Sequence, residues 1–265
     1  MTYDNEFYEK VLAHHDIVSE RVQSKGGVVL LTVPVGSQNY HLDTPKSDCD
    51  TFSFILPSFV SFIRGDAPES YEFEVDDGKC MVKDLRLALN LLRKPSPNSV
   101  ECWVTPYRVY NADYKEVFER FFNTKDCLFF MTHCSYTHMM DATIGTIKGM
   151  KGRNMSVGKK IAHTMRLTDM FMRYLMPKYE PSEYLEMGDE RLEIARKMKN
   201  SEATEDVYKL IREQTVSFLE EYREAFKIDS STIEKVQNAG HLIINKLQLS
   251  LMNVYFEKNG YRKNV

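Results

Sequence analysis

The sequence predicts an α+β protein in which the N-terminal half forms a sheet with helices and the C-terminal half is all helical. A largely apolar run at 28–33 has the length and composition of a buried strand. A hairpin signal follows at 71–83, where Asp77-Gly78 separates two segments of alternating residues. From Tyr114 onward the apolar residues recur at helical spacing. A sequence in which the strands come first and the helices follow is typical of the α+β class.

Composition and charge exclude several classes of protein. The chain has 265 residues, of which 43% are hydrophobic and 28% charged, as in soluble globular proteins. A formal net charge of −3 gives no overall attraction to nucleic acid, so any such contact needs a local basic patch. The five cysteines are odd in number and contain no C-x-x-C, which favours reduced thiols and a cytoplasmic location. No apolar stretch reaches about 18 residues and no signal peptide is recognisable, so we expect no membrane partner.

The first elements follow from periodicity and turn residues. A helix is predicted within residues 4–24, and its buried stripe carries Phe7, Val11, Val18 and Val22. Neighbouring side chains diverge on a helix, so His14 and His15 are interpreted as ordinary surface or boundary residues. After Gly26-Gly27 comes the strand at 28–33, then a second strand at 47–55 and a short helix within 57–68.

The hairpin prediction gives a register and two faces. With Asp77-Gly78 as a two-residue loop, Glu74 lies opposite Met81. One face is apolar (Phe73, Val75, Cys80 and Val82), and the other carries Glu72, Glu74, Asp76, Lys79, Met81 and Lys83. Asp84 directly precedes a helical pattern that ends near Pro95, which favours an N-cap role for its side chain; metal binding is the alternative.

Two short motifs stand on either side of a ten-residue gap. Gly36-Ser37 follows the first strand, and Asp48-Cys49-Asp50 opens the second. Because residues i and i+2 of a strand share a face, Asp48 and Asp50 are expected side by side, with Cys49 facing the core. Two adjacent carboxylates repel unless a cation lies between them, and Mg²⁺ prefers such oxygen ligands. The Gly-Ser turn offers backbone N–H groups and a hydroxyl to a phosphate.

This arrangement resembles the signature of the DNA polymerase beta-type nucleotidyltransferase superfamily, and more narrowly the predicted nucleotidyltransferases of bacteriophages and bacteria. The stretches that carry the resemblance are GSQNYHLDTPKSDCDTFSFILPS (36–58), VKDLRLAL (82–89), VECWVTPYRVYNADY (100–114) and KKIAHTMRLTDMFMRYL (159–175). The resemblance implies a nucleotidyltransferase domain at 1–112 with a mixed, largely antiparallel sheet. A helical domain at 113–265 would close over the nucleotide.

The resemblance also implies a third carboxylate on the neighbouring strand, at the position that is Met81 here. Methionine cannot bind Mg²⁺, so this departure puts catalysis in question. Glu74, placed opposite Met81 by the predicted register, is a hypothesis for the replacement; ion pairing with a lysine on a solvated face is the alternative. Glu101 is expected on the inner side of a short helix or strand, in a structural role or supporting the site electrostatically, with Trp103 in the core.

A basic cluster follows in the second half of the chain. Lys159, His163 and Arg166 are spaced i, i+4 and i+7, so they share one face of a helix. The resembling family has a similar pattern here, which implies binding of a triphosphate; a solvated basic face is the alternative.

The helices predicted in this half span 114–122, 127–149, 157–176, 191–199, 204–226 and 231–257.

Together, motifs and resemblance predict an enzyme that transfers a nucleoside monophosphate from a nucleoside triphosphate to an acceptor and releases pyrophosphate, with Mg²⁺ or Mn²⁺ as cofactor. Asp48 and Asp50 would hold the metal, and Gly36, Ser37 and the basic helix would hold the triphosphate. The acceptor is left open between RNA, protein and a small molecule. The alternative is a degenerate module on the same scaffold that binds a nucleotide or a protein without catalysis, and Met81 favours it.

Overall fold

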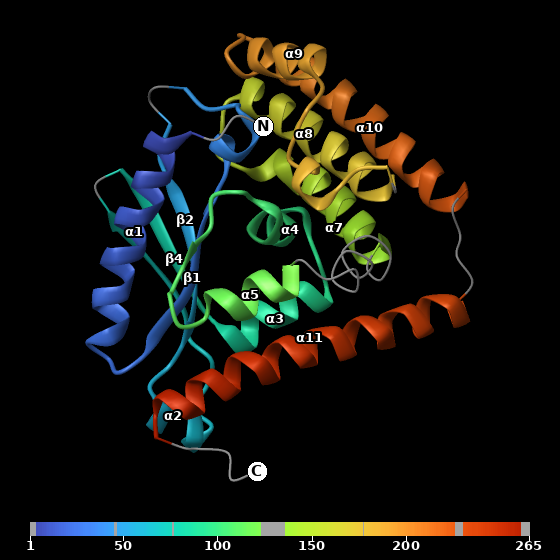
Figure 1. The fold of residues 1–265 in the computed structure, drawn as a ribbon. Helices are drawn as coiled ribbons and strands as arrows, with labels where there is room; N and C mark the ends of the chain where they lie inside the picture. The colour runs from blue at the N-terminus through green and yellow to red at the C-terminus, as the bar shows by residue number, and fades with distance from the viewer. Residues whose placement is uncertain are drawn as a thin grey trace.

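The computed structural model describes residues 4–44, 47–75, 77–122, 136–176, 178–225 and 230–260 and has the predicted α+β architecture (Figure 1). Its sheet has five strands in the order β3-β4-β2-β1-β5. Among these strands only the β2–β4 pair is parallel, so the sheet is mixed. The strands are β1 (Val28–Val35), β2 (Asp50–Leu56), β3 (Ser70–Val75), β4 (Gly78–Asp84) and β5 (Val109–Tyr110). The short strand β5 has no counterpart in the sequence prediction.

Helix α1 (Asn5–Gln23) covers one face of the sheet (Figure 1). Its N-cap is Asp4, whose carboxylate accepts a hydrogen bond from the backbone N–H of Phe7. The predicted stripe Phe7, Val11, Val18 and Val22 is buried. Contact with the apolar side chains of the sheet therefore accounts for this helix, as the periodicity predicted.

His14 and His15 are not surface or boundary residues, because only 2% and 8% of their areas are exposed. His14 Nδ1 lies 3.1 Å from the hydroxyl of Thr51, and His15 Nδ1 lies 2.9 Å from that of Thr32. The face of the sheet under α1 carries these buried hydroxyl groups, which supply the polar partners that a buried imidazole needs. The prediction considered the helix alone and could not include the strands it packs on.

The hairpin of β3 and β4 has the predicted faces but a different register. Glu74 pairs with Lys79, and Glu72 rather than Glu74 lies opposite Met81. The prediction is therefore wrong by two residues, since Val75 pairs with Gly78 and the loop lies before Gly78. A shift of two keeps every side chain on its predicted face, because the side-chain period of a strand is two.

Two helices join the sheet to the C-terminal half. Helix α3 (Leu85–Arg93) begins at Asp84, whose buried carboxylate accepts a hydrogen bond from the Arg86 N–H at 2.8 Å, so the predicted N-cap is confirmed. Helix α4 (Pro97–Val104) places Trp103 in the core, stacked on Phe54 with ring centroids 4.7 Å apart. The predicted burial of Trp103 is confirmed as well.

The C-terminal half is helical, as predicted, and the boundaries agree within a few residues over the described part. The remaining helices are α2 (Phe59–Arg64), α5 (Lys115–Phe122), α7 (Tyr136–Gly149), α8 (Val157–Leu175), α9 (Asp189–Lys199), α10 (Glu205–Ala225) and α11 (Ser230–Lys258). The first part of the helix predicted at 127–149 lies outside the described residues. Within the described ranges no helix combines the length and the apolarity that a membrane span requires.

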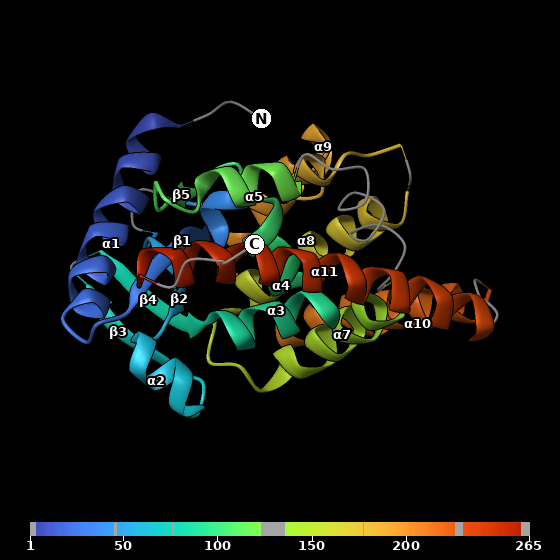
Figure 2. The same ribbon diagram turned by 60° about the horizontal axis from the view of Figure 1, so that its bottom comes forward.

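The last helix returns to the N-terminal half of the chain. Helix α11 runs below α3 and α5 and ends beside α2 (Figures 1 and 2). Its Tyr255 donates a hydrogen bond to the carbonyl of Pro57 at 2.6 Å, and its Phe256 contacts the rings of Phe59 and Phe62. The apolar side of α2 is therefore covered by residues almost 200 positions later in the chain.

Candidate active site

A cleft of about 790 Å³ lies where the sheet meets the helical half. Its walls come from the end of β1, the start of β2, the N-terminal parts of α4 and α8, and the C-terminal end of α9. Seven of the eight predicted site residues line it: Gly36, Ser37, Asp48, Asp50, Lys159, His163 and Arg166. The fold therefore brings the two acidic residues and the basic helix, more than 100 positions apart in sequence, into one cavity.

Asp48 and Asp50 form the acidic wall of the cleft. Strand β2 begins at Asp50, later than the prediction of a strand from 47, and Asp48 belongs to the segment just before it. Burial raises the pKa of the Asp50 carboxyl, and the neighbouring charge of Asp48 adds to this; the Lys79 backbone N–H, which donates to Asp50 Oδ1 at 3.1 Å, opposes it. Cys49 between them is buried in the core, as predicted.

The turn before β4 holds this acidic segment closely. The backbone N–H of Cys49 donates to the carbonyl of Asp77 at 2.7 Å. A Cβ added to Gly78 would lie 2.2 Å from the carbonyl oxygen of Cys49, which is shorter than any tolerable contact. Only glycine at position 78 therefore lets the hairpin approach the segment that carries Asp48 and Asp50.

Gly36 and Ser37 form the turn that leaves β1. Gly36 has a φ of 102°, a backbone conformation that favours glycine, and Ser37 opens a short 3₁₀ helix at 37–40. The carboxylate of Glu101 accepts hydrogen bonds from the Gly36 N–H at 2.5 Å and from Asn39 Nδ2 at 3.0 Å. Glu101 therefore holds this turn in place from α4, and it lines the cleft as well.

Glu101 is buried, with 2% of its area exposed, and two opposing effects act on its carboxyl. Burial raises the pKa of Glu101, whereas the Arg166 guanidinium and the hydrogen bonds from Asn39 and Gly36 lower it. The carboxylate of Glu101 thus partly compensates the charge of Arg166 inside the protein. Both of the roles that the sequence left open for Glu101, structural and electrostatic, have a geometric basis.

The basic wall comes from one face of α8, as the i, i+4, i+7 spacing predicted. Arg166 is 4% exposed, its guanidinium carbon lies 3.9 Å from the ring centroid of Tyr40, and its Nε atom has no hydrogen-bond partner among the described residues. His163 is largely buried, and its Nε2 atom also lacks a partner there. Buried polar atoms without partners are rare in proteins, and both side chains line the cleft, so a ligand that reaches these atoms would supply the missing partners.

His163 is neutral in the absence of a ligand. Burial lowers the pKa of its imidazole to about 2, and the charges of Arg166 and Arg153 contribute. The imidazole therefore offers a neutral hydrogen-bonding group rather than a positive charge near pH 7. Lys159 remains exposed at the mouth of the cleft, whereas its neighbour Lys160 lies outside the lining and pairs with Glu205 at 3.0 Å.

Lys199 is a cleft residue that the sequence analysis missed. It ends α9, lines the cavity and donates a hydrogen bond to the carbonyl of Leu42, while Arg196 one turn earlier donates to the carbonyl of His41 at 2.8 Å. Burial lowers the pKa of Lys199, and the charge of Lys159 adds to this effect. No local pattern around Lys199 pointed to the site, because only tertiary packing of α9 on α8 brings it there.

Met81 lines the cleft and Glu74 does not. Met81 is paired with Phe52 across the parallel strands, and both side chains contribute an apolar patch to the cavity. Glu74 lies on the outer strand β3, where its side chain is 84% exposed and its carboxylate is 4.0 Å from Lys79 Nζ. The register that suggested Glu74 as a third carboxylate is wrong, and the alternative of a solvated ion pair describes the observed contact.

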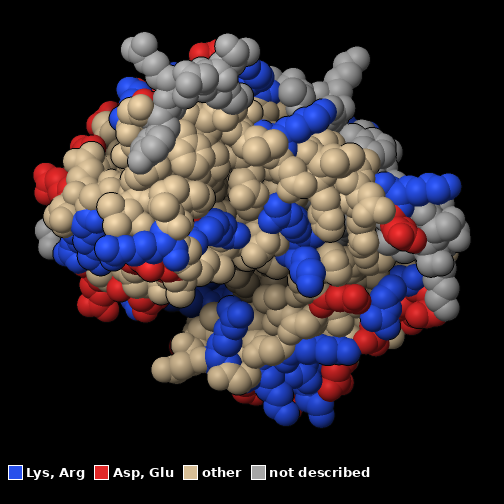
Figure 3. All heavy atoms as spheres, turned by 90° about the horizontal axis from the view of Figure 1, so that it is seen from below, with Lys and Arg blue, Asp and Glu red and all other residues tan. Residues whose placement is uncertain are grey.

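The cleft is basic although the chain as a whole is not. Its lining contains five Lys and Arg residues (Lys83, Arg153, Lys159, Arg166 and Lys199) against three acids, Asp48, Asp50 and Glu101. The net charge of the whole chain is −3. Figure 3 shows the molecule from below, and the face turned toward the viewer has a hollow near its centre. Lys and Arg side chains lie on both sides of this hollow. An anion is the ligand that this lining favours.

Comparison of the sequence with protein-family models and with curated proteins gives no match.

Proposed function

We infer that the chain transfers a nucleoside monophosphate from a nucleoside triphosphate to an acceptor and releases pyrophosphate. One observation carries this conclusion: Asp48 and Asp50 face the same cavity as the basic face of α8. Acidic and basic walls around one cleft suit a polyphosphate that reacts with the help of a divalent cation. The resemblance of the Gly-Ser and Asp-x-Asp stretches to nucleotidyltransferases gives the reaction class by analogy.

The residues of the basic wall are assigned to the triphosphate. Arg166 lines the cavity and has a buried Nε atom that lacks a partner within the described part of the chain, and Lys159 and Lys199 add positive charge near the same cavity. Charged hydrogen bonds of this kind are the stronger ones in proteins. The turn at Gly36 and Ser37, held by Glu101, adds a hydroxyl and backbone groups at the junction with the acidic wall.

Asp48 and Asp50 fit the requirements of a hard divalent cation. Burial raises the pKa of Asp50 and the charge of Asp48 adds to this, and a cation bound between the two carboxylates would favour their charged forms. Mg²⁺ or Mn²⁺ bound there would polarise the reacting phosphate and lower the pKa of an acceptor hydroxyl. The acceptor is RNA, protein or a small molecule.

A direct test is to incubate the protein with each α-labelled nucleoside triphosphate, Mg²⁺ or Mn²⁺, and a pool of cellular RNA, protein and small molecules. We expect label in one acceptor class. Asp48→Asn and Asp50→Asn should each lower transfer by at least roughly 100-fold, because they remove a metal ligand without changing side-chain size. Asp16→Asn, on the exposed side of α1, is the matched control. Full transfer by both cleft variants would contradict the proposed roles.

The second candidate is a nucleotide-binding module without catalysis, and Met81 favours it. At the place where the resemblance implies a third carboxylate, the cleft presents the apolar pair of Met81 and Phe52. In that case the wild-type protein binds a triphosphate but transfers nothing, and Met81→Asp creates metal-dependent transfer. A wild type that transfers label, and loses this activity on Met81→Asp, would exclude this candidate.

A further inference from the structure

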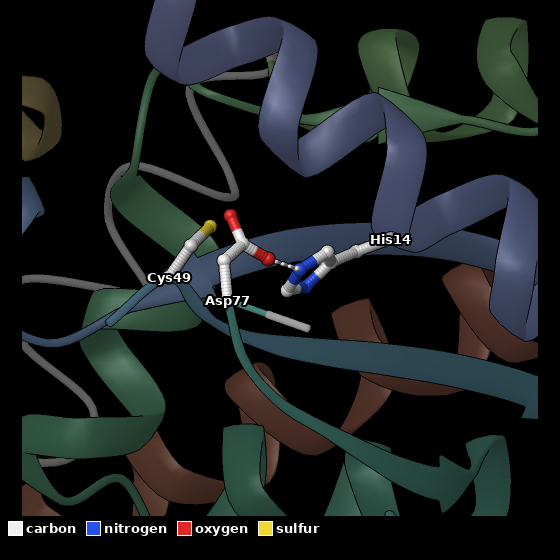
Figure 4. Close-up of side chains that lie close together, drawn as sticks. All are labelled: His14, Cys49 and Asp77. Carbon is white, nitrogen blue, oxygen red and sulfur yellow. Dashed lines mark hydrogen bonds and ion pairs between the residues drawn. The ribbon is translucent and has the colours of Figure 1, made fainter. Parts of the chain in front are cut away.

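Three side chains with metal-binding atoms meet on the face of the sheet opposite the cleft. His14 comes from α1, Cys49 from the segment before β2, and Asp77 from the turn before β4. One ligand atom from each lies within 4.8 Å of the other two. Figure 4 shows the carboxylate of Asp77 between the sulfur of Cys49 and the imidazole of His14. None of the three belongs to the lining of the proposed active site.

Hydrogen bonds orient His14 so that its Nε2 atom faces this cluster. Its Nδ1 atom lies 3.1 Å from Thr51 Oγ1, and the Thr51 hydroxyl donates to Cys80 Sγ at 3.4 Å. The Thr51 hydroxyl therefore holds the far ring nitrogen of His14 and leaves Nε2 directed at Asp77. A hydrogen bond from the far ring nitrogen is the usual device that orients a metal-binding histidine.

This orientation brings Nε2 of His14 within 2.7 Å of Asp77 Oδ1. Either an N–H proton on Nε2 or a cation bound by both atoms satisfies this contact. The nearby Cys49 sulfur favours the cation, because a thiolate is a strong ligand for a transition metal, whereas a thiol contributes nothing to a hydrogen bond between His14 and Asp77.

We propose that His14, Cys49 and Asp77 bind a Zn²⁺ ion, or a similar borderline divalent ion, in a second site behind the acidic wall of the cleft. Nitrogen, sulfur and carboxylate oxygen are the three ligand types that zinc takes, and a water molecule completes its tetrahedral set. Asp77 is 47% exposed, so the ion has a path from solvent. A hard ion such as Mg²⁺ avoids sulfur, which separates this site from Asp48 and Asp50.

The backbone already holds the three ligands near one another. The Cys49 N–H donates to the Asp77 carbonyl, and Gly78 permits the closest approach of the two segments. Binding the ion replaces the proton of the Cys49 thiol, which is released to solvent as the thiolate forms. The bound ion then links three parts of the chain: α1, the segment of Asp48 and Asp50, and the β3–β4 turn. This site does not depend on the proposed transferase activity.

Co²⁺ is the probe, because it takes the geometry of Zn²⁺ and gives a sulfur-to-cobalt charge-transfer band when a thiolate binds it. We expect one Co²⁺ per folded chain with this band, displacement of the band by Zn²⁺, and a rise in Tm with either metal. Cys49→Ser should abolish the band. Asp77→Asn, a change at a half-exposed residue, should weaken Co²⁺ binding at least about 100-fold, and Thr51→Ala should weaken it about 10- to 100-fold.

Two controls keep the test specific. Cys102→Ala removes another buried thiol, which belongs to α4 and lies outside the cluster, and should keep the band, as should a Cys127→Ser/Cys134→Ser double variant. A folded wild type without the band would overturn the proposal and leave His14 and Asp77 as a hydrogen-bonded pair. A band that survives Cys49→Ser would overturn it equally. If Cys49→Ser does not fold, Asp77→Asn takes its place, and an unchanged Co²⁺ affinity in that variant would overturn the proposal.

Discussion

The carboxylate of Glu101 accepts the backbone N–H of Gly36 at 2.5 Å, so a side chain from α4 holds the turn that leaves the first strand. The two residues are 65 positions apart. The same carboxylate accepts a hydrogen bond from Asn39 and lies in the field of Arg166. The geometry of the turn and the charge of the basic wall therefore depend on one buried residue.

Glu101→Ala should destabilise the fold. It leaves the Gly36 N–H without its acceptor and the Asn39 amide with only the Pro34 carbonyl, and each unpaired buried donor costs about 1–3 kcal/mol. Glu101→Gln keeps a carbonyl oxygen and should cost less. The measurement is the free energy of unfolding in urea. Glu119→Ala, at an exposed ion pair on α5, is the control and should stay within about 0.5 kcal/mol of the parent. Equal stabilities for Glu101→Ala and Glu119→Ala would contradict this role of Glu101.

Lys159→Ala and Arg166→Ala should weaken binding of a triphosphate more than binding of a monophosphate. Each charged contact to phosphate contributes roughly 1.5–3 kcal/mol, or about tenfold or more in Kd. Calorimetric titration with both nucleotides measures the difference. Lys159 is exposed, so its variant tests the contact without a change in folding. Lys209→Ala on α10 removes an exposed charge outside the cleft lining and should leave both affinities unchanged. Equal losses for the two nucleotides would mean that the cluster is only a solvated face.

The stability of the protein should fall as the pH is lowered below about 6.5, and His163 should contribute to this. The pKa of its imidazole is about 2 in the folded protein and about 6.5 when unfolded, so between these values the unfolded state binds one more proton. The contribution of His163 to the free energy of unfolding is fully present above pH 6.5. Below that pH it decreases by up to about 1.4 kcal/mol per pH unit. Urea unfolding of His163→Asn should show a shallower dependence between pH 6.5 and 4.

The control for this pH series is His241→Asn, at an exposed position of α11, which should keep the parent slope. If the free energy of unfolding of His163→Asn depends on pH as steeply as that of the parent, His163 takes up its proton in the folded protein. Addition of a triphosphate should reduce the contribution of His163, because an anion beside the imidazole favours its protonated form.

Gly78→Ala should destabilise the hairpin and the acidic segment together. The added methyl group would meet the carbonyl of Cys49, a backbone atom that no side-chain rotation can move away. Overpacking of this kind costs about 1–3 kcal/mol. The matched control is Gly145→Ala within α7, where nothing lies within 4 Å of the new Cβ. That variant should gain up to about 1 kcal/mol, because alanine favours a helix. A Gly78→Ala protein as stable as the parent would show that the two segments separate easily.

Much of the fold follows from local patterns, and the points that did not follow depend on tertiary contacts. Apolar periodicity placed α1, α3 and α8 and gave the correct faces of β3 and β4. The hairpin register was missed because Asp77-Gly78 has the composition of a turn, while Gly78 serves as the strand residue beside Cys49. Turn composition alone cannot distinguish these two uses of glycine.

The candidate site was predictable where its residues were close in sequence. Asp48, Asp50 and the spacing on α8 required only strand and helix periods. Lys199 was not predictable, because its place depends on how α9 packs on α8. The burial of His14 was not predictable either, because its partner, the hydroxyl of Thr51, belongs to another element.

The return of α11 to the N-terminal half has a consequence for how the chain folds during synthesis. Phe59 and Phe62 of α2 obtain their apolar cover from Tyr255 and Phe256, which are translated almost 200 residues later. Until then the sheet half exposes a surface that other chains can bind. A polypeptide truncated before α11 should therefore aggregate, or be held by chaperones, even though every residue of the cleft has already been made.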